Sequence, residues 1–417
     1  MANKTVYVLG GGTFSHVRSH LALAAPAFGG TAKWLHMLIN GDRRFDNFDV
    51  ALQLTKMAAS ESSIVTNVDV GVLVDSIIAD ASAKIVFMNM ALCDFDGAID
   101  NVPSGKYAER LRTIEGSQSI DITPAAKVIG RIREHRKDIF VVGFKTTCGA
   151  PESVMFERGL DLLKKNSLNL VLANDIGTRT NMIVTPEEGA YSYKTREDAL
   201  GNLVDMAWYR SHLSFTRSTV IAGEAVPWTD ARVYPALRKV VDWCVSMSAY
   251  KVFNSVTTGH FAAKLSDTDF LTSIRKTNFN NLYENGLVHV KTDGPGKVIA
   301  MGYKPSVGGQ SQRIIFEEFS DTDCIVHFHC PLLAEPNDDI QVMSQKEYEC
   351  GSHECGENTR NGLTKHGNLY AVMLDNHGPN IVFNHDIDPQ EVIDFISNNF
   401  AMDESTSGYE QVYLPKR

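Results

Sequence analysis

The sequence lacks any apolar run approaching twenty residues, and it lacks an excess of positive charge. A transmembrane helix needs about 20 consecutive apolar residues, so we expect no membrane-spanning segment. The 40 lysines and arginines stand against 50 aspartates and glutamates, which gives a net charge of −10. This balance argues against a protein whose main task is to bind nucleic acid, but small anionic substrates need only a local positive site.

The sequence also lacks a disulfide framework, because its seven cysteines are odd in number and irregularly spaced. Such cysteine usage is typical of a reducing cytoplasm, and we expect no signal peptide before the first strand-like segment. No internal repeat or low-complexity tract is present. A chain of 417 residues exceeds one typical core, so we expect two domains, at residues 1–215 and 225–417.

Strand-like and helix-like segments alternate through the first half of the chain. The strand-like runs lie at 5–9, 69–74, 84–88, 138–144 and 168–175, and the helical patterns at 124–135 and 152–165. This alternation predicts an α/β fold with a mostly parallel, Rossmann-like sheet covered by helices on both faces. A glycine-rich turn is expected after the first strand, but the dinucleotide-binding Gly-x-Gly-x-x-Gly spacing fails at Ser15.

Several polar positions in this half are candidate ligands. The glycine-rich turn either favours phosphate or is only a tight strand–helix connection. Asn174 and Asp175 follow a strand, where ligand sites of α/β proteins collect. Asp94 is either a ligand or a helix cap, and Arg112 is either a phosphate contact or a solvated charge.

Residues 5 to about 210 resemble the phosphopantothenate–cysteine ligase family. The matching segments, in order, are Gly11-Gly12-Thr13, Ala91-Leu92-Cys93-Asp94-Phe95, Arg110-Leu111-Arg112, Pro124-Ala125-Ala126-Lys127, Val142-Gly143-Phe144-Lys145 and Ala173-Asn174-Asp175. The resemblance implies a site for CTP or ATP with magnesium. Its residues would be Gly10, Gly11, Gly12, Thr13, Asp94, Arg110, Arg112, Phe144, Asn174 and Asp175.

Two departures from that family indicate a changed substrate or reaction. Arginines replace the lysines of the nucleotide loop, and arginine is not an equivalent phosphate ligand. The family's Asn-x-Ser-Ser-Gly segment, which handles the acyl intermediate, corresponds to 24–29 here and contains no asparagine.

A different chemistry is indicated by histidines in the second half. His327 and His329 are two residues apart behind an apolar run, so on a strand their side chains would share one face. His377 follows about fifty residues later, at the end of another apolar run. Three histidines with an open coordination position are typical of catalytic zinc. The alternative is a strand with two satisfied histidines and an unrelated third one.

Residues 228 to 400 resemble the class II aldolase/adducin superfamily. Matching segments run from Thr257-Thr258-Gly259-His260 through Phe270-Leu271-Thr272-Ser273, Lys304-Pro305-Ser306 and Gly351-Ser352-His353-Glu354 to Asn376-His377-Gly378. The resemblance implies an α/β domain with a divalent metal on His327, His329 and His377. It also implies substrate or phosphate contacts from Thr258, Gly259, His260, Ser273 and Ser306, where His260 stands in place of the family's asparagine.

The main departure is a missing carboxylate. The family has a glutamate, acting as acid or base beside the metal, at the position of Gly308. Proton transfer needs a group within hydrogen-bond reach of the reacting atom, so ordinary retro-aldol chemistry is in doubt. Glu317 or Glu318 is a candidate substitute from a neighbouring helix.

Three functions follow as hypotheses. The first is a fused enzyme, in which a metal-dependent aldolase-, epimerase- or dehydratase-like site acts on a small phosphorylated sugar or hydroxyacid beside a nucleotide-binding domain. The second is a nucleotide-dependent ligase whose aldolase-like domain is structural. The third is a non-catalytic, adducin-like assembly module. Both resemblances imply a homo-oligomer, either a dimer or a tetramer.

Overall fold

The structure, a computed structural model, describes residues 3–99 and 105–406. The chain forms two compact units, one of Met1–Pro186 and Ser192–Ser211, the other of Glu187–Tyr191 and His212–Arg417. The short segment Glu187–Tyr191, which precedes residue 215 in the sequence, therefore belongs to the second unit. The expected domains, 1–215 and 225–417, do not include this exchange. Among the described residues, no helix combines the length and apolarity needed to cross a membrane.

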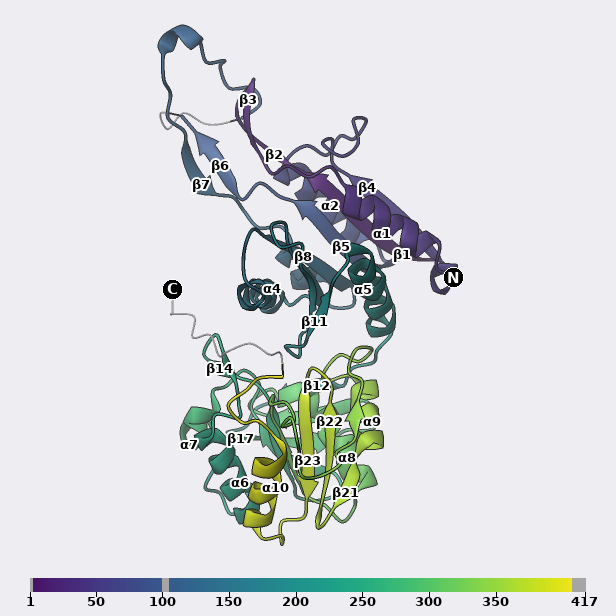
Figure 1. The fold of residues 1–417 in the computed structure, drawn as a ribbon, viewed down its shortest axis with the longest axis vertical. Helices are drawn as coiled ribbons and strands as arrows, with labels where there is room; N and C mark the ends of the chain where they lie inside the picture. Colours follow the sequence, from purple (N-terminus) through teal and green to yellow (C-terminus); the bar gives the residue numbers. More distant parts are fainter. Residues whose placement is uncertain (1–2, 100–104, 407–417) are drawn as a thin grey trace. The chain divides into compact units, whose positions relative to one another are not determined.

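The first unit is built on a seven-stranded sheet (Figure 1). The strands run in the order β11, β10, β9, β8, β5, β1, β4. Their bounds are β1 Lys4–Gly12, β4 Phe48–Leu54, β5 Ala83–Ala91, β8 Phe140–Thr147, β9 Leu170–Asp175, β10 Asn181–Val184 and β11 Ala190–Tyr193. The five strands from β4 to β9 pair in parallel, and β10 runs antiparallel to β9.

Helices cover both faces of this sheet, as predicted. They are α1 Gly30–Asn40, α2 Asn67–Ala79, α3 Gly130–His135, α4 Glu152–Asn166 and α5 Arg196–Ser211. A Cβ on Gly10 would meet Ala32 of α1, whereas one on Gly143 would meet Ile129 beside α3. In the strand register, Gly143 of β8 pairs with Met88 of β5, and Met88 pairs with Leu9 of β1. Paired residues point to the same face of a sheet and consecutive residues to opposite faces, so Gly10 and Gly143 face opposite sides.

Three local predictions in this unit are wrong. The alternating run 69–74 lies inside α2, because Thr66 and Asp69 form a capping box that starts a helix there. The glycines predicted to turn after Leu9 are the last residues of β1, paired with β5. Residues from Pro124 onward begin as the end of a strand, and helix α3 starts only at Gly130.

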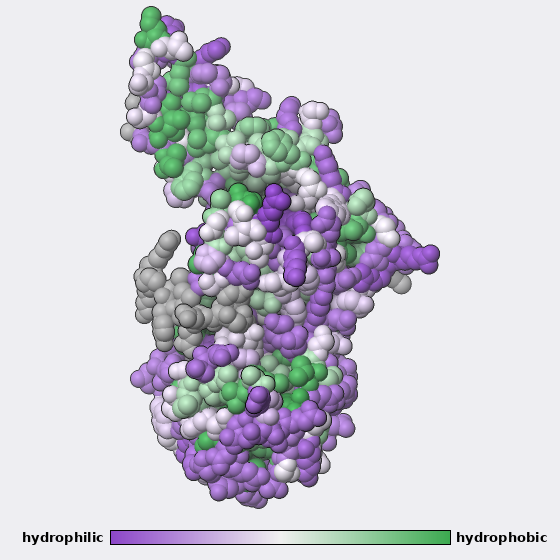
Figure 2. Space-filling model, in the orientation of Figure 1, coloured by the Kyte–Doolittle hydropathy of each residue, from purple (hydrophilic) through white to green (hydrophobic). Residues whose placement is uncertain are grey.

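Two hairpins form an arm that extends from the first unit (Figure 1). They are β2 Phe14–Arg18 with β3 Leu21–Ala24, and β6 Phe95–Ala98 with β7 Asp121–Pro124. Large apolar side chains are exposed here, including Phe95, Ile114 and Ile122. Figure 2 shows hydrophobic residues gathered over this arm. Exposed apolar patches of this kind often mark interaction surfaces.

The second unit is built on a ten-stranded, largely antiparallel sheet. The order is β12, β18, β17, β16, β15, β19, β23, β22, β20, with β21 also paired to β22. The bounds are β12 Arg217–Ile221, β15 His260–Lys264, β16 Asp269–Ser273, β17 Leu287–Thr292, β18 Lys297–Met301, β19 Cys324–His327, β20 Val342–Met343, β21 Thr364–His366, β22 Leu369–Leu374 and β23 Gly378–Phe383. A small hairpin, β13 Val252–Phe253 with β14 Val256–Thr257, and the short helix α7 Leu282–Asn285 complete it.

Helices pack on both faces of this sheet as well (Figure 1). One face carries α6 Pro235–Ser246 and α10 Pro389–Asn399, over a core that includes Phe261 and Val326. The other carries α8 Gln310–Glu318 and α9 His353–Gly362, over a core that includes Ala262 and Ile325. The strands thus alternate between two apolar cores, which makes the central strands β15, β19 and β23 rigid supports for a site.

Candidate metal centre

The three predicted histidines come together at the ends of neighbouring strands. His327 is the last residue of β19, and His329 follows two residues later. His377 lies in the turn between β22 and β23. Their candidate ligand atoms all lie within 4.8 Å of one another, and all three side chains are buried. Within the described part of the chain, no other group of three His, Cys, Asp or Glu residues is arranged to hold a metal ion.

A hydrogen bond to the backbone fixes the tautomer of His327. Its Nδ1 donates to the carbonyl oxygen of Pro379 at 2.7 Å, so Nε2 carries the lone pair. That Nε2 is buried and has no hydrogen-bond partner among the described residues. A buried polar atom without a partner is costly unless something binds it. The donor set therefore fits a divalent metal such as zinc, which takes neutral imidazole nitrogens.

Electrostatics favour the neutral form of His327. Burial lowers the pKa of His327 well below its ordinary value, and the neighbouring imidazoles lower it further. The ring centroids of His327 and His377 are 4.6 Å apart, and those of His329 and His377 are 5.0 Å apart. Because a protonated His327 would be buried beside two other imidazoles, its uncharged, metal-binding form is favoured.

A glycine lets the two histidine segments approach each other. Gly378 has a φ of +143°, and a Cβ built on it would lie 2.0 Å from the carbonyl oxygen of Phe328. Phe328 separates His327 from His329, whereas Gly378 directly follows His377. No larger residue fits between these backbones without moving them.

A fourth histidine lies beside the triad, on the face covered by α8. His260 pairs in register with His327, and His327 with Asn380, so the three side chains form a row across the sheet. Nε2 of Gln312 donates to Nδ1 of His260 at 3.0 Å. Burial lowers the pKa of His260 to about 3, with a smaller contribution from His329. A neutral, hydrogen-bonded histidine thus stands where the aldolase family has an asparagine.

The predicted phosphate contacts lie on segments adjoining this row. A Cβ on Gly259 would lie 2.5 Å from the carbonyl oxygen of His327, which places Gly259 and Thr258 next to β19. Ser273 ends β16 and is fully buried. Ser306 directly follows Pro305, which forms a bridge with Ile274. The structure therefore groups these positions pairwise, Thr258 with Gly259 and Ser273 with the Ser306 segment.

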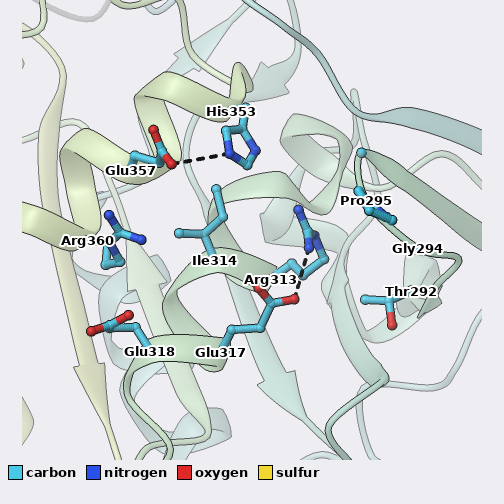
Figure 3. Close-up of a pocket in the computed structure, with 11 residues that line it drawn as sticks. Thr292, Gly294, Pro295, Arg313, Ile314, Glu317, Glu318, His353, Glu357 and Arg360 are labelled. Carbon is cyan, nitrogen blue, oxygen red and sulfur yellow. Dashed lines mark hydrogen bonds and ion pairs between the residues drawn. The ribbon is translucent and has the colours of Figure 1, made fainter.

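Glu317 and Glu318 lie elsewhere. They line a cavity of about 560 Å³ between α8 and α9, and no histidine of the triad contributes to its lining (Figure 3). The Glu317 carboxylate accepts from Arg313 at 2.9 Å, so it is engaged in a surface ion pair. The structure does not bring either glutamate together with the three histidines.

The predicted nucleotide residues of the first unit fall into separate groups. The Cβ directions of Gly10, Gly11 and Gly12 are filled by neighbouring side chains and backbone. Thr13 is bonded to Asn67 and to the backbone amide of Cys93. The remaining positions are half-buried or exposed: Asp94, paired with Lys127, and Arg110, Arg112, Phe144 and Asn174.

Asp175 is fully engaged by the protein itself. Its carboxylate accepts from the backbone amides of Gly149, Ala150, Gly177 and Thr178 at 2.8 to 3.0 Å. The Thr147 hydroxyl donates to it at 2.7 Å. These bonds, led by the one from Thr178, hold the pKa of Asp175 far below its ordinary value. Five donors nearly saturate a carboxylate, so this residue ties two loops together at the end of the sheet.

Three residues near the histidines have no counterpart in the sequence prediction: Glu188, Gln312 and Asn380. Asn380 interrupts the wholly buried strand Gly378–Phe383. A polar residue inside such an apolar run is a signal that could have been used. Gln312 occupies a buried helical position next to Ile314 and Ile315, a weaker signal. Glu188 belongs by sequence to the other half, and no pattern links it to His329.

One family model matches part of the second half of the chain. Residues 238–388 match the family model of the Class II Aldolase and Adducin N-terminal domain, which confirms the predicted resemblance of the second half. No curated protein matches the chain.

Among solved structures, the chain is similar to the DNA/pantothenate metabolism flavoprotein from Streptococcus pneumoniae, with 18% identity, 49% of this chain and 97% of that one covered, and a TM-score of 0.41. For the C-terminal domain of the coenzyme A biosynthesis bifunctional protein CoaBC, the identity is 11%, the coverage 49% and 94%, and the TM-score 0.38. For L-fuculose 1-phosphate aldolase, the identity is 14%, the coverage 39% and 81%, and the TM-score 0.29.

Proposed function

We propose that the second unit is a divalent-metal enzyme of the aldolase, epimerase or dehydratase type, acting on a small phosphorylated sugar or hydroxyacid. One observation carries this proposal. Three buried histidines from two segments place their ligand atoms within 4.8 Å of one another. A purely structural role would not require imidazoles to converge in this way, because buried polar atoms otherwise need hydrogen-bond partners.

His327, His329 and His377 would hold the metal, with zinc as the expected ion. Bound there, it would act as a Lewis acid that polarises a carbonyl or hydroxyl group and stabilises an enediolate. The protein supplies the orientation. Pro379 fixes the ring of His327 through its carbonyl oxygen, and the flanking β-strands keep the histidines in place.

Substrate phosphate would be bound by Thr258, Gly259, Ser273 and Ser306. Support comes from Gly259, whose backbone lies directly beside His327. His260 would contact the substrate close to the metal, since it is the next side chain in the same row across the sheet. It is held neutral, so it would act through hydrogen bonding and not through charge.

For the first unit we propose binding of a nucleotide, CTP or ATP with magnesium. The parallel strands β1, β5, β8 and β9 support this, since ligands in such sheets bind beyond the carboxyl ends of the strands. Gly12, Thr13 and Asn174 lie at those ends or directly beside them. A ligase reaction in which the second unit is only structural is the competing proposal.

We further propose that the protein works in the cytoplasm as a symmetric dimer or tetramer. Five of the seven cysteines, Cys93, Cys148, Cys244, Cys324 and Cys330, are free thiols in the structure, which fits a reducing compartment. The exposed apolar side chains of the arm support a surface that a second subunit would cover.

Elemental analysis of the purified full-length protein tests the metal proposal. We expect about one zinc or other divalent ion per chain in the wild type and almost none in His327→Ala or His377→Ala. His353→Ala removes a histidine of the same unit outside the triad and should leave the content unchanged. Turnover would then be screened with sugar phosphates and hydroxyacid phosphates.

A wild-type protein that binds no metal, even after zinc is added back, would contradict the proposal. The ligase alternative would then be tested by measuring pyrophosphate release from CTP or ATP with a carboxylate acceptor.

A further inference from the structure

A buried glutamate stands beside the metal centre. Glu188 is 8% exposed and belongs to the segment Glu187–Tyr191 of the second compact unit. Its Oε2 lies 3.6 Å from Nδ1 of His329, and both side chains are largely shielded from water. Buried carboxylates are rare unless they are paired, so this proximity calls for an explanation.

The contact distinguishes the two nitrogens of His329. Nδ1 is buried, and no described group lies within hydrogen-bond distance of it. The Glu188 carboxylate, which only accepts hydrogen bonds, lies 3.6 Å from this Nδ1. A proton on Nδ1 directed at this carboxylate would leave the lone pair on Nε2. His327 follows the same pattern, with Nδ1 on the Pro379 carbonyl and Nε2 without a partner.

The backbone at Glu188 is also unusual. Its φ is +68°, in the left-handed region that non-glycine residues adopt rarely. Gly189 is the next residue, so a glycine with the required freedom is available one position away. Conformations of this kind persist where the surrounding structure enforces them, and they cluster at ligand-binding sites.

We propose that Glu188 is the outer carboxylate of the metal centre, accepting the Nδ1 proton of His329 and thereby directing Nε2 toward the metal. Glu188 is thus a positioning residue: it fixes the tautomer and ring orientation of His329 and makes that ligand more basic. It also brings a negative charge to a site where the aldolase family's own glutamate position is occupied by Gly308. This inference rests on the proposed metal-dependent function.

Metal affinity of the full-length protein tests the inference, measured with zinc in competition with a chromophoric chelator. We expect Glu188→Ala to weaken zinc binding by about 10- to 100-fold, the usual effect of removing such a partner. Glu188→Gln should lose less, since its amide oxygen still accepts a hydrogen bond. Glu335→Ala, at an exposed position of the same unit, should bind like the wild type.

Cobalt substitution gives a second measurement that general destabilisation would not mimic. The visible absorption band of the cobalt-loaded protein should shift in Glu188→Ala, because a less basic His329 weakens the ligand field. The band of Glu335→Ala should stay at the wild-type position. Thermal unfolding of the metal-free proteins would show that each variant is folded before loading.

The outcomes separate the two proposals. If the wild type binds zinc and Glu188→Ala binds it within about twofold as tightly, with an unshifted cobalt band, the role of Glu188 is wrong and the triad stands. If the wild type itself binds no zinc, the proposed function fails, and the role of Glu188 fails with it.

Discussion

Two buried polar groups, one in each unit, lie at the ends of central strands and differ in how fully their hydrogen-bonding atoms are satisfied. Asp175 at the end of β9 receives five hydrogen bonds from its own unit. His327 at the end of β19 makes one hydrogen bond, donated by its Nδ1, while its Nε2 has no partner among the described residues. A saturated group stabilises the fold, whereas an unsatisfied one in a rigid setting is suited to a ligand.

The largest expected effect is the stabilisation by zinc bound at His327. Zinc at 1,000 times its dissociation constant should raise the free energy of unfolding by about 4 kcal/mol, because it binds only the folded state. In His327→Ala the same zinc addition should produce little change. Thermal unfolding with and without zinc, and after chelation, measures this. An equal zinc effect in both proteins would show that His327 is not a ligand.

The next effect concerns the close backbone approach at the triad. Gly378→Ala should lower the free energy of unfolding by about 3 kcal/mol, since its Cβ would lie 2.0 Å from a carbonyl oxygen. Gly294→Ala is the matched control. Gly294 has a φ of +79°, yet a Cβ there meets nothing within 4 Å, so about 1 kcal/mol is expected. Urea unfolding compares the two, and equal losses would mean that the segments separate easily.

Asp175 should make the free energy of unfolding depend on pH. The pKa of Asp175 is lowered, so its contribution to stability is present above its unfolded value of about 3.8 and is lost as pH falls below that value. Asp175→Asn should be less stable at neutral pH and lose less stability on acidification. The control is Asp121→Asn on the exposed strand β7. Urea midpoints between pH 6 and 3 measure the slopes, and parallel slopes for Asp175→Asn and wild type would contradict the assignment.

The smallest expected effect is the loss of stability when His260, beside the triad, loses its hydrogen bond from Gln312. Gln312→Met should cost about 1 kcal/mol, because Nδ1 of His260 would remain buried without its donor. Gln390→Met, on the exposed side of α10, should change the free energy of unfolding by less than about 0.5 kcal/mol. Chemical unfolding of metal-free protein measures both. No loss in Gln312→Met would mean that His260 finds another partner.

The sequence allowed the fold class of both units and the convergence of the histidines to be predicted, for a local reason. Alternating apolar segments predict strands, and a spacing of two on a strand places His327 and His329 on one side of the chain. The prediction at 69–74 is wrong because Thr66 and Asp69 form a capping box that starts a helix, whereas alternating valines alone are typical of a strand. Glycines 10 to 12 end a strand and do not form the predicted turn, because a glycine that packs closely and a glycine that turns look alike in sequence.

Contacts between distant segments could not be predicted in the same way. Glu188 and His329 are 141 positions apart, and no sequence motif contains both residues. Glu317 and Glu318 are predicted as substitute carboxylates only because their helix precedes His327 in the sequence. Which side of that helix faces the triad depends on packing, and the structure pairs Glu317 with Arg313 instead.

The segment Glu187–Tyr191 has a consequence for how this chain can be divided. The polypeptide passes from one unit to the other after Pro186, after Tyr191 and after Ser211. A gene fragment encoding only residues 212–417 would therefore retain every histidine of the triad and omit Glu188. If Glu188 positions His329 as proposed, such a fragment would carry the metal ligands without the carboxylate that orients one of them, so a cut at residue 212 would not yield a complete site.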